Sequence, residues 1–304
     1  MDVEKLKWKD VKDYIDRLNS KLRIIGSGYI IIPWSFETKS YGNNMSNTLN
    51  IVEPVKVINA IGRGYEGIEQ ITIPKTTKII GAHAFLMCNK VSNIDIPEGT
   101  ISIDLGAFAR MSKLEKVVLP SSIKCIGIAS FSSCHNMKEL VLNEGLQEIC
   151  KHAFEECSIE TLVIPNSVIH IGQGAFRRCG KLKDVKLGSG VGCIEGGIFS
   201  GCIELENVEL NEKITTIPEE AFWGCEKLHN IKLKEGLTHI EERAFKECKC
   251  IEFIEIPNSV ISIGTDAFAS CKALKRVIVH NIDAEYRLKE AKLSQGVEIR
   301  YVAN

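Results

Sequence analysis

The stretch that decides the fold is residues 165–187, PNSVIHIGQGAFRRCGKLKDVKL, because its pattern recurs along most of the chain. One phenylalanine marks each copy, and successive copies are 23 residues apart, except for the 22 residues between Phe154 and Phe176. The nine marker residues are Phe85, Phe108, Phe131, Phe154, Phe176, Phe199, Phe222, Phe245 and Phe268. A fixed period of this length is typical of a repeat protein, in which one supersecondary unit stacks on the next.

A cysteine follows the marker phenylalanine by three residues in eight of the nine copies, and Met111 takes its place in the other. The set comprises Cys88, Cys134, Cys157, Cys179, Cys202, Cys225, Cys248 and Cys271. We call such a set, which occupies one repeat position in successive units, a column. Free cysteine behaves as a small buried hydrophobic residue. The column therefore predicts core packing, with disulfide or metal roles as minor alternatives.

The remaining cysteines, Cys125, Cys150, Cys193 and Cys250, lie outside that column and are the better candidates for accessible thiols, although ordinary packing is the preferred interpretation. No CxxC pair exists, and Cys248 and Cys250 are too close in sequence for the usual zinc spacing. The seven histidines do not share one column. The sequence therefore predicts no metal site and no cofactor.

Each unit combines two local patterns. The segment before the proline alternates inward Ile, Leu or Val with outward polar residues, which indicates a half-buried strand. The segment around the phenylalanine has apolar residues at i and i+3, which suits one short helical turn. Glycine often precedes it, as at Gly172 and Gly264, but other residues replace this glycine, so a positive φ is not obligatory there. A single unit is too small to fold alone, and stacking supplies the shared core.

The complete unit resembles the BspA-like (Treponema-type) leucine-rich repeat family, whose consensus is LxxIxIPxxVxxIGxxAFxxC. Residues 162–179 and 254–271 match this consensus position by position, and the resemblance covers roughly residues 51–280. It implies an α/β solenoid, a leucine-rich repeat superhelix with a parallel β-sheet on the concave face and short helical or irregular turns on the other faces. It also implies adhesion or protein recognition, often on microbial surfaces, without naming a ligand.

Three regions are expected. Residues 1–50 form an N-terminal capping segment, with an amphipathic helix at 3–22, a strand at 30–32 and a polar loop at 35–50. Residues 51–280 form the solenoid, whose first repeat, 51–73, is degenerate, as the open end of a stack requires. Residues 281–304 form a C-terminal cap with a helix at 284–293 and a strand at 297–302. The alternative for the first helix is a second partner-binding element.

Composition and motifs exclude several function classes. The formal net charge of -1 gives no bulk attraction for nucleic acid or an anionic membrane. No apolar run approaches the length of about 18 residues that a membrane-spanning helix needs. The charged start has no secretory signal pattern, so we expect a cytoplasmic protein, with the cell surface or secretion as the alternative from the resemblance. Neither a G-x-S-x-G elbow nor a phosphate-binding loop occurs, so no enzymatic activity is expected.

The outward position between the two inward residues of LxxIxI is the most informative column. Val118, Val141 and Val163 are expected to form an apolar strip on the concave strand face. Beyond the strip, this column continues with charges of alternating sign, Lys186, Glu209, Lys232 and Glu255, and the position two residues earlier adds Lys116, Glu139 and Asp184. These ten residues are the predicted partner-binding set. The alternative is that valine simply favours strands and that the charges pair across strands.

The leading hypothesis is a non-enzymatic protein–protein interaction module that binds an unidentified protein partner through the concave strand face. One alternative is a surface or secreted adhesin that recognises host protein or glycan, and another is a structural spacer without a dedicated ligand. The residue missing between Phe154 and Phe176 falls in residues 157–159, so a local change of twist is expected beside the valine strip.

Overall fold

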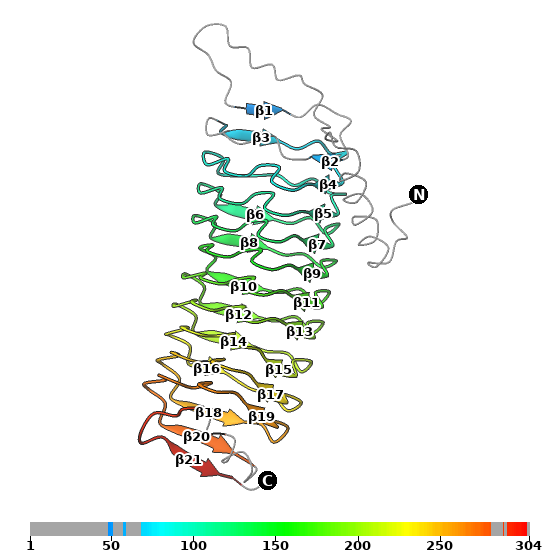
Figure 1. Cartoon of the computed structure of the whole chain (residues 1–304). Coiled ribbons are helices and arrows are strands. Elements are labelled where there is room, and N and C mark those ends of the chain that lie inside the picture. Colours follow the sequence, from blue (N-terminus) through cyan, green and yellow to red (C-terminus); the bar gives the residue numbers. More distant parts are fainter. Residues whose placement is uncertain (1–47, 51–56, 59–67, 281–287, 289–290, 303–304) are drawn as a thin grey trace, which may run out of the picture.

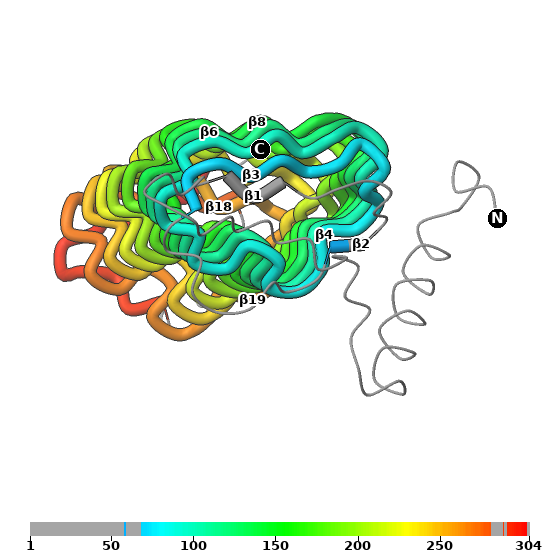
Figure 2. The backbone as a smooth tube through the Cα atoms, turned by 90° about the horizontal axis from the view of Figure 1, so that it is seen from above, coloured from blue at the N-terminus to red at the C-terminus, as the bar shows by residue number. Residues whose placement is uncertain are grey.

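The chain forms a parallel β-solenoid, in which each coil lies directly on the one before it (Figures 1 and 2). The structure is a computed structural model, and it describes residues 48–50, 57–58, 68–280, 288 and 291–302. The expected helix at 3–22, strand at 30–32, most of the loop at 35–50 and most of the helix at 284–293 lie outside the described residues. The expected leucine-rich repeat solenoid is confirmed.

The LxxIxI segments form parallel strands, which we call the first ladder. Its members are β1 (Thr48–Asn50), β3 (Gln70–Thr72), β6 (Lys116–Val118), β8 (Glu139–Val141), β10 (Thr161–Val163), β12 (Asp184–Lys186), β14 (Asn207–Glu209), β16 (Asn230–Ile231), β18 (Phe253–Ile256), β20 (Arg276–Val279) and β21 (Glu298–Tyr301). The loop expected through Asn50 is wrong at its end, because residues 48–50 form β1 and pair with β3. The strand expected at 297–302 is present as β21.

A second ladder of two-residue strands, which was not foreseen, accompanies the first along the described coils from β2 to β19. Its members are β2 (Val57–Ile58), β4 (Ile79–Ile80), β5 (Ser102–Ile103), β7 (Cys125–Ile126), β9 (Glu148–Ile149), β11 (His170–Ile171), β13 (Cys193–Ile194), β15 (Thr216–Ile217), β17 (His239–Ile240) and β19 (Ser262–Ile263). The second residue of each strand is a buried isoleucine, whereas the residue type at the first position varies. The two ladders run side by side along the rod (Figure 1).

The helical turn expected around each phenylalanine is wrong, and the described residues contain no helix. A tight turn takes its place, flanked by two residues of positive φ, such as His152 (55°) and Glu156 (60°). Left-handed residues interrupt a right-handed helix. The amide of Phe154 instead donates to the carbonyl of Ala175 in the next coil, at 2.8 Å. Gly172 serves close packing, since a Cβ there would lie 2.6 Å from the backbone nitrogen of Lys151.

The core is a continuous stack along the rod axis. Neighbouring phenylalanine rings have centroid separations from 5.1 to 5.9 Å and lie nearly parallel. The core cysteines pack beside them, and the thiol of Cys179 donates to the carbonyl of Phe154 at 3.2 Å. Burial raises the pKa of the Cys179 thiol to about 12, which keeps it protonated. The prediction of core packing for this column is confirmed.

Candidate functional site

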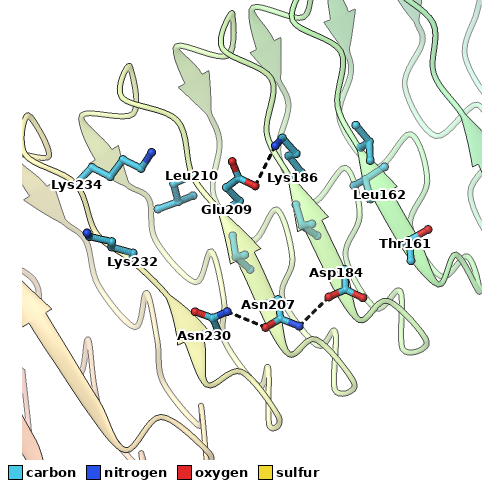
Figure 3. Close-up of a pocket in the computed structure, with 13 residues that line it drawn as sticks. Thr161, Leu162, Asp184, Lys186, Asn207, Glu209, Leu210, Asn230, Lys232 and Lys234 are labelled. Atoms are coloured by element: carbon cyan, nitrogen blue, oxygen red, sulfur yellow. Dashed lines mark hydrogen bonds and ion pairs between the residues drawn. The ribbon is translucent and has the colours of Figure 1, made fainter.

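The outward surface of the first ladder is hollowed. A depression of about 490 Å³ lies over β10, β12, β14 and β16, and its residues are drawn in Figure 3. A second depression, of about 800 Å³, lies nearer the N-terminal end and includes Thr72, Asp95 and Val118. Because every strand contributes the same repeat position, the period of the chain places these side chains in rows along the rod.

The first depression brings together five of the ten predicted residues. Its lining includes Val163, Asp184, Lys186, Glu209 and Lys232. Of the other five, Val118 lines the second depression. The remaining four, Val141, Lys116, Glu139 and Glu255, lie on the same ladder outside both hollows.

The valine strip is exposed at both ends and partly covered in the middle. The exposed fraction is 43% for Val118 and 63% for Val163, whereas Val141 is half-buried. Val118 and Val141 are direct partners in the ladder. In the described part of the chain no ladder pairing joins β8 to β10, where the spacing is 22 residues, or β16 to β18, where it is 23, although the amide of Glu160 still donates to the carbonyl of Lys138 at 3.3 Å. The strip therefore runs from the sheet of β6 and β8 to the sheet that begins at β10, and the change of twist expected beside it stays a prediction.

Several predicted charges pair with each other. The ammonium of Lys116 lies 2.6 Å from a carboxylate oxygen of Glu139, and that of Lys186 lies 3.2 Å from Glu209. All four side chains are exposed, and exposed pairs of this kind contribute about 0–1 kcal/mol. In the free protein these charges therefore pair across neighbouring strands, as the alternative to partner binding expects.

Two cations in the depression differ from these pairs. Lys232 and Lys234 line its β16 side, and neither makes an ion pair with a described residue. At the β12–β16 edge, Asn230 donates to Asn207 at 3.0 Å and Asn207 donates to Asp184 at 2.7 Å (Figure 3). Sequence reasoning missed Lys234, although its position two residues after Lys232 was a usable signal for the same face.

The second ladder carries polar chemistry that sequence reasoning also missed. Cys125, Glu148, His170 and Cys193 occupy one column in four successive units. The signal was the repeat register itself, because residues 22 or 23 apart become neighbours in a solenoid. Cys193 and Cys250 are exposed, so the preferred interpretation of ordinary packing is wrong for these two, whereas Cys125 and Cys150 are half-buried.

Sequence comparison assigns the family. The model for the BspA type leucine rich repeat region matches residues 63–180 and 147–275 and recognises six copies. The chain belongs to this family. BspA-type solenoids are generally non-enzymatic, and the fold is in general one of protein–protein interaction or adhesion. No helix among the described residues combines the length and apolar character needed to cross a bilayer.

Solved structures of bacterial leucine-rich repeat proteins are similar to this chain. The Treponema pallidum leucine rich repeat protein is 26% identical, with 75% of this chain and 89% of that one covered and a TM-score of 0.46. A Bacteroides ovatus leucine-rich repeat protein is 20% identical, with coverages of 84% and 94% and a TM-score of 0.41. A leucine rich cell surface protein from Faecalibacterium prausnitzii is 21% identical, with coverages of 81% and 90% and a TM-score of 0.38. Among curated proteins, no sequence matches significantly.

Proposed function

We propose that this chain is a non-enzymatic binding module that holds a protein partner against the concave face of the first ladder. The observation that carries the proposal is the depression over β10–β16, where the exposed Val163 lies in the same hollow as Lys232 and Lys234, which make no ion pair with any described residue. Repeat proteins bind through surfaces built by stacking one outward position from every unit.

The outward face of the first ladder combines two kinds of contact, which meet in the depression at Val163, Lys232 and Lys234. The valine strip supplies an apolar anchor, and desolvated apolar centres dominate the energetics of protein interfaces. Lys232 and Lys234 supply positive charge that acidic side chains of a partner would neutralise. The paired charges of Lys116 with Glu139, and of Lys186 with Glu209, add polar groups that fix the register of the partner rather than its affinity.

The test is affinity capture from the native cell with quantitative mass spectrometry, comparing the protein with a Val118→Asp/Val141→Asp/Val163→Asp variant. We expect the variant to lose the partner while its circular dichroism spectrum stays unchanged. Ile169→Asp/Ile261→Asp is the matched control, because these residues lie beside the second ladder with exposed fractions of 53% and 58%. The single Val163→Asp variant provides the same comparison if the triple variant does not fold. Unchanged capture by both strip variants would remove this face from consideration.

Adhesion is the second candidate function, with host protein or glycan as the ligand. It is compatible with the family, and the similar protein from Faecalibacterium prausnitzii is described as a cell surface protein. Cell fractionation separates the candidates, since an interaction module acting inside the cell remains in the cytoplasmic fraction and an adhesin reaches the surface.

A further inference from the structure

A group of metal-binding residue types gathers on the second ladder. Cys125 begins β7, Glu148 begins β9 and His170 begins β11, and the three are direct partners in the parallel register. Cys150 follows Glu148 by two residues, which returns its side chain to the same face. Four residues that span 46 positions of sequence are thus brought to one place by the solenoid period.

The distances within the group are short. The sulfur atoms of Cys125 and Cys150 are 3.7 Å apart, and the Cys150 sulfur is 3.7 Å from Oε1 of Glu148. One ligand atom from each of these three residues lies within 4.8 Å of the other two. The same Oε1 of Glu148 is 3.6 Å from Nδ1 of His170. Glu148 is therefore the centre of the group, with thiols on one side and the imidazole on the other.

These separations match the edges of a tetrahedral zinc site. With Zn–S bonds of about 2.3 Å and Zn–O bonds of about 2.0 Å, two thiolates lie about 3.8 Å apart and a thiolate and a carboxylate oxygen about 3.5 Å apart. A disulfide is a poorer description of the pair, because its sulfur atoms would be about 2.05 Å apart. The side chains are half-buried, which leaves a path for an ion to enter.

We propose that Cys125, Glu148 and Cys150 bind a zinc-class divalent cation on the second ladder, with His170 of the next strand, whose Nδ1 lies 3.6 Å from Oε1 of Glu148, as the candidate fourth ligand. Thiolate and imidazole ligands together select zinc over the hard cations calcium and magnesium. The ligand set is distinct from the first-ladder face, so the site does not depend on the proposed partner-binding function.

The surroundings favour a cation. The carboxylates of Glu148 and Asp104 lie close enough to the Cys125 thiol to repel a thiolate there. A bound divalent ion offsets this repulsion and takes both cysteines as thiolates, with release of their protons. The core cysteines are unsuitable ligands, because each of those from Cys134 onward is buried and donates its S–H to a backbone carbonyl.

Glu195 supports the group from outside. One of its carboxylate oxygens is 3.0 Å from Nε2 of His170, the ring nitrogen that faces away from Glu148. A carboxylate on the distal nitrogen of a metal-bound histidine fixes the tautomer and the ring orientation, and its loss typically weakens binding about 10–100-fold. Glu195 is therefore a positioning residue in this proposal.

The test is a titration of the tag-free, reduced and chelator-stripped full chain with Zn²⁺, and separately with Co²⁺ as a spectroscopic probe. We expect one ion per chain, and with Co²⁺ the intense visible absorption of tetrahedral coordination together with a thiolate charge-transfer band. Cys125→Ser and Cys150→Ser should each weaken binding more than 100-fold, and Glu195→Gln about 10-fold. The matched controls are Cys193→Ser and Cys250→Ser, which remove exposed thiols and should bind as the unmodified chain does.

Three results would overturn the proposal, provided that circular dichroism shows every variant to be folded. The first is the absence of stoichiometric uptake by the reduced chain. The second is uptake that the Cys125→Ser/Cys150→Ser variant retains at the same affinity. The third is a Co²⁺ spectrum without the charge-transfer band, which would place the ion on carboxylates or imidazoles elsewhere.

Discussion

The two ladders share one backbone period but carry different chemistry on their outward columns. On the first ladder, opposite charges such as Lys116 and Glu139 face each other in adjacent strands and pair. On the second, Cys125, Glu148 and His170 stand in adjacent strands and bring thiol, carboxylate and imidazole together. The repeat thus fixes where side chains meet, whereas the variable positions decide whether a face suits a protein surface or an ion.

The largest expected effect comes from the core that both ladders share. Phe154 is fully buried, with ring centroids 5.3 Å from Phe131 and from Phe176. Phe154→Ala should lower the free energy of unfolding by about 3–5 kcal/mol, since it leaves a cavity in the stack. Urea unfolding followed by circular dichroism measures this loss. Val163→Ala on the exposed face is the control, with an expected change within about 0.5 kcal/mol. Equal effects of the two substitutions would mean that the stack does not hold the ladders together.

The second-largest effect on stability should come from zinc bound at the second ladder. Zinc at 100 times its dissociation constant should raise the free energy of unfolding by about 2.7 kcal/mol through preferential binding to the folded chain. The Cys125→Ser variant should gain none of this stabilisation, while Cys193→Ser should gain all of it. Parallel urea unfolding curves with and without Zn²⁺ provide the comparison. Stabilisation that survives in Cys125→Ser would place the ion elsewhere.

The paired charges of the first ladder should contribute little to stability. A double-mutant cycle with Lys116→Ala and Glu139→Ala should give a coupling free energy of about 0.2–1 kcal/mol, because both side chains are exposed to water. The coupling should shrink as salt is added. A coupling well above 2 kcal/mol would contradict the solvated geometry.

The smallest effect on stability should come from the protonation of His280, at the C-terminal end of the first ladder. Glu255 accepts a hydrogen bond from Nε2 of His280 at 2.7 Å and raises the pKa of that imidazole above its ordinary value of 6.5. The resulting stabilisation is fully present below the unfolded-state pKa and is lost as the pH rises through the folded-state pKa. An NMR titration of His280 should show the raised midpoint, and Glu255→Gln should lower it. A midpoint that Glu255→Gln leaves in place would assign the shift to another group.

The sequence predicts those features that repeat strictly. The phenylalanine and cysteine columns and the strands of the first ladder follow from the fixed spacing and from alternation over several residues. The second ladder was missed because a two-residue strand, such as His170–Ile171, is too short to show a period. The turn at Phe154 was mistaken for a helix because spacing of i and i+3 also fits a tight turn with positive φ at His152 and Glu156.

Side-chain groups are harder to predict than the fold. Neither a CxxC pair nor a column of cysteines or histidines reveals the group around Glu148, because it joins different residue types from successive coils. Likewise, the alternating charges of the first-ladder column gave no indication that Lys186 pairs with Glu209 while Lys232 stays without an ion-pair partner among the described residues. Such details depend on side-chain conformations that the repeat spacing leaves free.

The most direct test of the separation between the two faces is site-specific photo-crosslinking in the native cell. A photoreactive phenylalanine analogue replaces either Val163 on the first ladder or Ile169 beside the second, residues of one coil whose exposed fractions are 63% and 53%. The account predicts a discrete cross-linked partner from position 163 and none from position 169. The same partner cross-linked from position 169 alone would contradict it.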